Sequence, residues 1–323
     1  MVDLSLYVNN DGYLKVTNLS LPINGLSAFR GSRKTEFFPY PVNGVAEEGY
    51  GVTFCPHNAT HLDLPWCIDW NSNITKSCLR EDLRLERRIP LDPEQRRKWI
   101  LEHVRPKILN SVILNFTDLV DNVSSYIETD KWGVNKKHVR SDLNPTDLKE
   151  LLDILHIKAE DIKAKIDSIN TKNKLLIIHT GWFKGFYEYN QNYSDPLNDG
   201  FRLYLAHPYL STNEMLTLIK DCAIEGIASD TLGLDAFVYH LPSREACMPY
   251  LKPIFENSRS SFPQAMPVHV SMLSQGKLLI ENVTNLEKIQ KKDERVTEIP
   301  LYVFPVQMAS IDACLLQIFA PQR

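Results

Sequence analysis

The sequence predicts an α/β fold in a single domain. Segments with the pattern of buried strands alternate with segments of helical period through the middle of the chain, an order typical of sheets covered by helices. Hydrophobic residues make up 43% of the 323 positions, which is enough to form a substantial core. No internal repeat or low-complexity linker divides the chain, so one domain over residues 1–323 with surface insertions is the simplest organisation.

The N-terminal third is expected to begin with β-structure and to continue into a capped helix. Segments that alternate apolar and polar residues flank Asn9–Gly12, which is typical of a hairpin. Asp92 can cap a helix whose first turn holds Pro93. The apolar face of this helix would consist of Trp99, Ile100 and Val104.

Buried strands and capped helices alternate in the middle of the chain. The strands are predicted at residues 111–119, 174–182 and 226–235. Asn144 followed by Pro145 predicts the start of one helix, and Ser211 with Glu214 forms a capping box for another. The final third is expected to contain a short helix, a strand and a β-rich C-terminal run.

The charge pattern argues against a nucleic-acid partner. Lysine plus arginine number 36 against 40 aspartate plus glutamate, and no cationic block of the kind that binds phosphate occurs. No apolar run approaches the roughly 18 residues needed to span a bilayer, and the N-terminus lacks a signal-peptide pattern. The six cysteines contain no CxxC pair, which argues against a disulfide framework or zinc ribbon. We therefore expect a cytoplasmic protein without a membrane partner.

The segment CPHNATHLDLPWC, which begins at Cys55, holds the first candidate site. In extended chain, residues of equal parity share a face, so His57, His61 and Asp63 could turn to the same side. Two imidazoles and a carboxylate suit a divalent metal such as zinc or manganese. The same pattern also fits histidines that are hydrogen-bonded in a surface loop, so these residues alone leave both interpretations open.

A metal site of this kind needs further ligands from elsewhere in the chain. His269 and Glu281 are the natural candidates, because they flank a helical segment and the strand KLLIE near the C-terminus. Imidazole and carboxylate are again ligands that suit zinc or manganese.

Short segments along the chain, in a fixed order, carry a family resemblance. They are HNATHLDLP, LLIIHTGW, HPYLS, GIASDTLGLD and HVSMLSQGKLLIENVTNL. They stand where the family has HxGTHxDxP, TGW, PGLS, GxDxxSxD and a histidine followed by a glutamate before Asn-Leu, with Ala59 in place of the glycine of the first pattern. With these motifs the chain resembles the metal-dependent cyclase family of hydrolases, which includes bacterial kynurenine formamidase and isatin hydrolase. Residues 69–107 and 236–263 have no counterpart in this resemblance and are predicted insertions.

The resemblance implies a fold and a metal site. The fold would be a compact mixed β-barrel with helices packed around it. His57 and His61 would hold one metal ion, Asp63 and Glu281 would be shared, and His269 would hold a second ion. The cofactor would be zinc or manganese, with one or two ions per chain.

The chain departs from the family pattern at its proton-transfer position. The family has a shuttle histidine where this chain has Cys67, and a thiol near cations could act as base, acid, ligand or nucleophile, or be inert. His207 lies in a segment that faces the family's site and could replace the shuttle. Gly233 stands where the family has serine. Trp66 and Trp182 could line an aromatic substrate pocket or simply pack in the core.

The resemblance implies a metal-dependent hydrolase of an amide or cyclic carbonyl bond, C–N or lactone, in a small molecule. Metal-bound hydroxide would attack the carbonyl carbon. Two alternatives stay open: a biosynthetic cyclase or dehydratase on the same metal site, and a catalytically weakened homologue that binds a small molecule or a partner. Family members commonly assemble through their N-terminal segments, so a homodimer or larger homo-oligomer is also expected.

Overall fold

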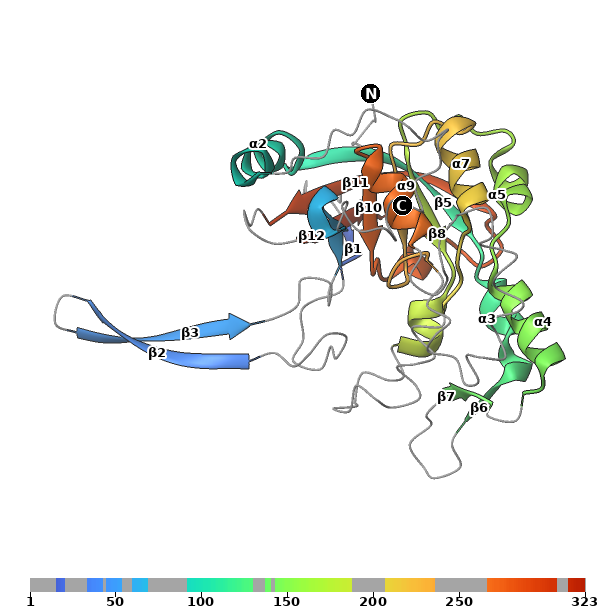
Figure 1. The fold of residues 1–323 in the computed structure, drawn as a ribbon, viewed down its shortest axis with the longest axis horizontal. Helices are drawn as coiled ribbons and strands as arrows, with labels where there is room; N and C mark the ends of the chain where they lie inside the picture. Colours follow the sequence, from blue (N-terminus) through green and yellow to red (C-terminus); the bar gives the residue numbers. More distant parts are fainter. Residues whose placement is uncertain are drawn as a thin grey trace.

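A closed mixed β-barrel lies at the centre of the molecule (Figure 1). The computed structural model describes residues 16–20, 34–42, 45–53, 60–68, 92–129, 137–140, 143–187, 207–235, 266–306 and 313–322. Within these residues the barrel strands are β4 (His61–Asp63), β5 (Lys107–Asn115), β8 (Leu175–His179), β9 (Gly226–Ser229), β10 (Leu278–Glu281), β11 (Val296–Pro305) and β12 (Ala313–Pro321). The mixed β-barrel that the family resemblance implies is confirmed.

The strand order explains how the barrel closes. Strands β5, β8, β9 and β10 are parallel neighbours, and β11 continues the sheet antiparallel to β5. Strand β12 pairs with β11 along one edge and with β4 along the other, while β4 also pairs with β10. The short strand β4 is therefore the piece that completes the ring. Strand β1 (Val16–Asn18) pairs with the far end of β12.

Side chains point alternately to the two faces of each strand, and this produces two separate apolar clusters. One cluster fills the barrel interior and takes residues from every barrel strand, among them Leu62, Ile113 and Ile280. The other lies between the outer face of the barrel and the helices, where Leu176 and Leu279 pack. At about 25 cal/mol per Å² of apolar surface, these two clusters supply the main driving force for folding.

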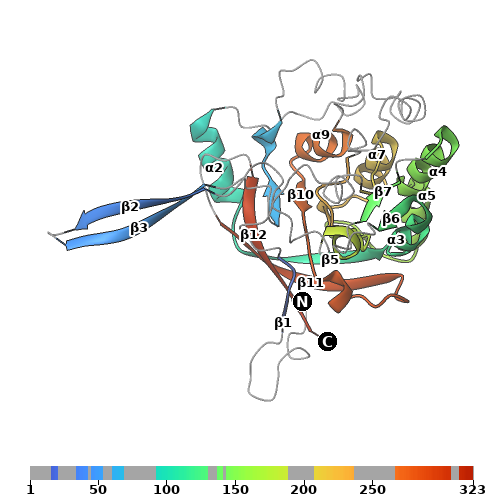
Figure 2. The same cartoon turned by 90° about the horizontal axis from the view of Figure 1, so that it is seen from below.

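Helices cover the outer face of the parallel strands (Figure 2). The described helices are α2 (Pro93–His103), α3 (Asp118–Asn122), α4 (Pro145–Leu155), α5 (Ala159–Ile166), α7 (Thr212–Lys220) and α9 (Pro267–Ser274). Helices α5, α7 and α9 contribute to the outer cluster. Helix α2 instead sends Ile100 into the interior cluster, and Val104, the residue that follows the helix, also belongs to it. Trp99 packs against this cluster, so the predicted apolar face is confirmed.

The predicted helix starts are confirmed by their hydrogen bonds. Asp92 accepts a hydrogen bond from the backbone N–H of Gln95 at 2.8 Å, and Asn144 forms a complete capping box with Asp147. The carboxylate of Glu214 accepts from the backbone N–H of Ser211 at 2.9 Å and also from its hydroxyl. Local capping signals therefore placed these helices correctly.

The predicted bounds of the central strands were wrong. The strand expected at residues 111–119 ends at Asn115, because the side chain of Asn115 accepts hydrogen bonds from the N–H and hydroxyl of Thr117 and turns the chain toward α3. The strands expected at 174–182 and 226–235 end at His179 and Ser229. In the first case the side chain of Asn115 competes with strand continuation. In the other two, the carboxylate of Asp230, just after β9, accepts hydrogen bonds from the N–H and hydroxyl of Thr180, just after β8.

Shorter elements lie around the barrel. They are the hairpin of β2 (Lys34–Val42) and β3 (Val45–Thr53), the pair β6 (Ile127–Thr129) and β7 (Lys137–Val139), the 3-10 turns at Pro65–Cys67, Ser124–Tyr126 and Leu286–Lys288, and a π-helical turn at Phe183–Tyr187. The β2–β3 hairpin extends away from the barrel in both views (Figures 1 and 2). None of the helices in the described ranges is both long and apolar enough to cross a membrane.

Part of the sequence interpretation falls outside the described residues. The hairpin expected around Asn9–Gly12, the predicted insertion 236–263 and residues 69–91 of the other insertion belong to this part. Residues 92–107 of the first insertion hold helix α2 and the first residue of β5. The single domain with two insertions stays a prediction.

The buried Glu214 gives a first testable prediction. Burial alone would raise its pKa, but hydrogen bonds from His156 and Ser211 outweigh burial and lower the pKa from 4.5 to about 2. A lowered pKa means that the contribution to stability is present above about pH 4.5 and is lost as the pH falls toward 2. We expect Glu214→Gln to cost about 1–3 kcal/mol of unfolding free energy near neutral pH.

Urea unfolding between about pH 3 and pH 7 measures this effect. The difference between wild type and Glu214→Gln should shrink as the pH falls. Glu160→Gln is the matched control, because Glu160 is an exposed glutamate in the first turn of α5. A difference that is constant with pH, or equal to that of the control, would contradict the prediction.

Candidate metal centre

The register between β10 and β4 brings the first site residues together. Glu281 lies directly opposite His61 in this antiparallel pair, and opposite residues project to the same face. Asp63 follows His61 by two residues and so shares that face. Leu62 and Ile280 project to the other face and belong to the interior cluster. The predicted common face of His61 and Asp63 is therefore observed, on the outside of the barrel.

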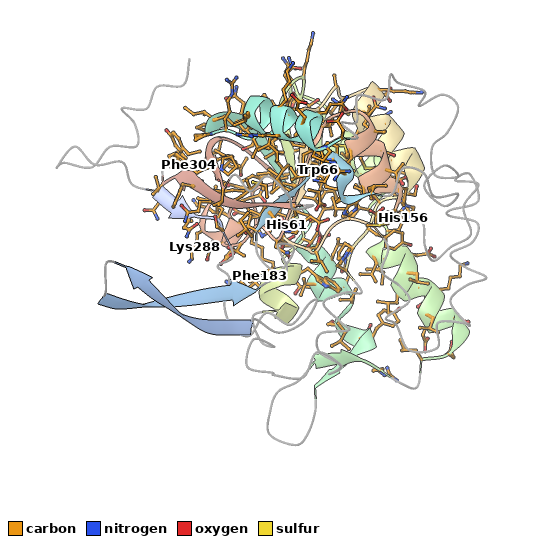
Figure 3. The ribbon with its side chains drawn as sticks, turned by 60° about the vertical axis from the view of Figure 1, so that its left-hand side comes forward. His61, Trp66, His156, Phe183, Lys288 and Phe304 are labelled. Carbon is orange, nitrogen blue, oxygen red and sulfur yellow. The ribbon has the colours of Figure 1, made fainter. Side chains whose placement is uncertain are left out.

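The three side chains form one compact group. The Nε2 atom of His61 lies 3.4 Å from Oδ1 of Asp63 and 3.2 Å from Oε2 of Glu281. One ligand atom from each residue lies within 4.8 Å of the others, and all three side chains are buried. In Figure 3 His61 lies well inside the molecule. Among the described residues this group has the composition and spacing that could hold a metal ion.

Helix α9 adds a second histidine to the group. The Nε2 atom of His269 lies 3.0 Å from Oδ2 of Asp63 and 3.2 Å from Oε1 of Glu281. Each carboxylate therefore faces both imidazoles, with one oxygen toward His61 and the other toward His269. This arrangement is the one expected for carboxylates shared between two ions.

Gly233 provides the space in which Glu281 lies. Its φ of +110° is in the region that favours glycine, and an added Cβ would lie 2.5 Å from Oε1 of Glu281 and 3.5 Å from Cε1 of His269. The absence of the family's serine at this position therefore makes room beside the carboxylate. Sequence reasoning noted the departure but not its steric consequence.

The buried carboxylates of Asp63 and Glu281 require positive charge nearby. Burial alone would lower the pKa of His61, but its hydrogen bonds and attraction to Asp63 and Glu281 outweigh burial and raise it to about 10. The pKa of His269 is raised well above its ordinary value in the same way. Burial and Asp63 raise the pKa of Glu281, yet His269 and His61 bring it down to about 2. Two buried carboxylates are thus balanced by protons on the imidazoles or by a cation.

The candidate proton-transfer residues lie in different surroundings. Cys67 is half-buried in the turn that follows β4 and packs against the outer apolar cluster. His207 is buried, and its Nδ1 lies 2.8 Å from the carbonyl oxygen of Pro208. Burial lowers the pKa of His207, while the hydrogen bond to Pro208 and the charges of Glu281 and Asp235 partly oppose this effect.

The two candidate substrate tryptophans also differ. Trp66 lies next to helix α2, with its ring centroid 5.7 Å from that of Trp99 and the Arg96 guanidinium carbon 5.5 Å from its ring centroid (Figure 3). Trp182 is almost fully buried, and its backbone N–H donates to the hydroxyl of Thr180. Packing accounts for both positions, and a contact with substrate stays a prediction for each.

Two further histidines, His57 and His179, lie in the segments that carry the family motifs. His57 lies outside the described residues, so its role as a ligand stays a prediction. His179 is a core residue with a buried partner, since its Nδ1 lies 3.0 Å from Oε1 of the buried Gln290. Sequence reasoning missed Asp235, whose carboxylate contacts Nδ1 of His269, although this residue is the last one of the quoted segment GIASDTLGLD.

The fold and the buried histidine–carboxylate group define a barrel with a candidate metal centre on its outer face. Residues 2–236 match the model of the family Cyclase, described as "Putative cyclase", and the chain belongs to this family. His269 and Glu281 lie beyond the matched residues, so it is the tertiary structure that joins them to His61 and Asp63. No curated protein matches the sequence.

Solved structures share the fold over almost the whole chain. Isatin hydrolase A from Labrenzia aggregata, bound to benzyl benzoate, is 13% identical, with a TM-score of 0.50 and coverage of 94% of this chain and 93% of that chain. Isatin hydrolase A from Ralstonia solanacearum is 11% identical, with a TM-score of 0.50 and coverage of 96% and 92%. A structure described as a novel cyclase is 15% identical, with a TM-score of 0.53 and coverage of 99% and 89%. At these identities the likeness establishes the fold.

The glycine beside Glu281 gives the second prediction. Gly233→Ala should displace the Glu281 carboxylate and lower the affinity for Zn²⁺ by about tenfold or more, as expected when a ligand loses its orientation. Gly276→Ala is the matched control, because Gly276 also has a positive φ, +64°, but no atom lies within 4 Å of the added Cβ. Competition with a fluorescent chelator measures both affinities. Equal zinc affinity in the two variants would contradict the prediction.

Proposed function

We propose that this chain is a metal-dependent hydrolase that cleaves an amide or cyclic carbonyl bond, C–N or lactone, in a small molecule. The observation that carries the proposal is the convergence of His61, Asp63, Glu281 and His269 on the outer face of a Cyclase-family barrel. A likeness in fold to isatin hydrolases supports the choice of a cyclic amide among the candidate substrates.

The residues present fit a divalent cation. Imidazole nitrogens and carboxylate oxygens are ligands that suit zinc, with manganese as the alternative. His57 and His61 would hold one ion, His269 would hold a second, and the carboxylates of Asp63 and Glu281 would be shared. Gly233 leaves the carboxylate of Glu281 the room that this requires. When bound, a divalent ion polarises a carbonyl oxygen and lowers the pKa of a bound water.

Hydrolysis also requires transfer of a proton, and we assign this role to His207 in preference to Cys67. A carbonyl oxygen can only accept, so the contact with Pro208 assigns the proton to Nδ1 and the lone pair to Nε2. Burial keeps the imidazole neutral near pH 7, the form in which it acts as a base. Cys67 is half-buried and packs against the outer apolar cluster.

Metal content and turnover, measured together, test the proposal. Wild type purified without chelator should carry about one or two zinc or manganese ions per chain and hydrolyse a member of a panel of small amides, lactams and lactones that includes isatin. Asp63→Asn combined with Glu281→Gln should lose both, because each carboxylate faces both histidines. Asp293→Asn, an exposed substitution, is the control.

Each alternative result has a definite meaning for this proposal. Folded wild type without bound metal would rule out the metal site. Bound metal without turnover on any amide, ester or lactone would rule out the hydrolase and support a homologue that only binds its ligand. Ring closure or dehydration in place of hydrolysis would support the biosynthetic alternative on the same site.

Substitution of the two proton-transfer candidates separates their roles. His207→Gln should lower kcat by about 10²- to 10⁴-fold, as is typical for loss of a general base, while metal content stays unchanged. Cys67→Ala should change kcat by less than about fivefold, since no base is removed. The opposite pattern would assign proton transfer to Cys67. The pH dependence of kcat in wild type provides the independent check.

A further inference from the structure

Asp235 is a buried aspartate that joins two distant parts of the site. It follows strand β9 and lies 34 residues before His269 in the chain. One carboxylate oxygen accepts the backbone N–H of Val268 at 2.7 Å. The other lies 3.2 Å from the backbone nitrogen of His269 and 2.5 Å from its Nδ1. A single carboxylate therefore contacts both the start of a helix and the ring of a site residue.

The helix contacts compensate for a missing local cap. Helix α9 begins after Met266, which makes no side-chain capping hydrogen bond, and Pro267 in its first turn has no N–H to satisfy. The next N–H groups, those of Val268 and His269, are the ones that Asp235 accepts. A negative charge at a helix N-terminus is also favourable with respect to the helix dipole. Asp235 thus fixes where α9 starts and hence where His269 lies.

The ring contact fixes the direction of His269. With Nδ1 held by the Asp235 carboxylate, Nε2 is the atom that faces Oδ2 of Asp63 and Oε1 of Glu281, at 3.0 and 3.2 Å. Nε2 is therefore the atom available to a cation between the two carboxylates. Histidines that bind metals commonly donate their other ring N–H to a carboxylate, which sets the tautomer and the orientation of the ring.

We propose that Asp235 is a positioning residue of the metal centre, which holds His269 in the tautomer and orientation that direct Nε2 to the metal. Metal binding itself rests on the proposed function, whereas the orientation of the ring exists without the metal. The role is separate from that of Asp230, which is buried in the same segment but accepts from the N–H and hydroxyl of Thr180.

The test compares Asp235→Asn with Asp230→Asn in the full chain. Asparagine keeps an oxygen that can still cap α9, so the helix start is preserved while the carboxylate that binds Nδ1–H is lost. The first readout is the Nδ1–H proton resonance of His269 in the metal-free protein, identified by its absence in His269→Gln. The second is the affinity for Zn²⁺ alone, measured by competition with a chelator.

Asp235→Asn should shift the Nδ1–H resonance upfield and lower zinc affinity by about 10- to 100-fold, the range typical of lost outer-sphere partners of metal ligands. Asp230→Asn should change neither readout. Unchanged resonance and affinity in Asp235→Asn would overturn the proposal, as would equal losses in the two variants. If wild type binds no zinc, the proposed function fails, and the resonance of the metal-free protein still decides whether Asp235 holds His269.

Discussion

The antiparallel pairing of β10 with β4 is the constraint on which the candidate site depends. It places Glu281 opposite His61 and leaves Leu62 and Ile280 to fill the barrel. A register shift of one residue would turn the site residues into the apolar interior, so the hydrophobic pattern itself enforces the pairing. Strand β4 also pairs with β12, where His61 lies opposite Leu315. The strand pairing that closes the barrel therefore also brings the site residues together.

Buried charge is the cost of this arrangement. Two carboxylates lie in a dry environment, where an unpaired charge would be strongly destabilising. The structure balances them with two imidazoles whose pKa values are raised by the same carboxylates. A divalent cation would take over this balance and release the protons, which couples metal binding to pH. The two buried carboxylates therefore need either protonated imidazoles or a cation beside them.

The loop after β9 contacts two residues of the candidate site. Gly233 leaves space for the carboxylate of Glu281, and Asp235 holds the ring of His269 and the first turn of α9. Helix α9 is itself buried between this loop and the outer apolar cluster. The loop thus affects the positions of both site residues, sterically at Gly233 and by hydrogen bonding at Asp235. Side chains near a metal centre commonly orient its ligands in this way.

The sequence by itself determined the features that depend on near neighbours in the chain. The caps at Asp92 and Asn144 and the common face of His61 and Asp63 follow from local hydrogen bonding and from strand parity. The ends of the strands did not follow, because side chains and loops compete with strand continuation there. Only the tertiary structure set Glu281 opposite His61 and Asp235 against His269, since these contacts join residues far apart in the chain and depend on how the barrel closes.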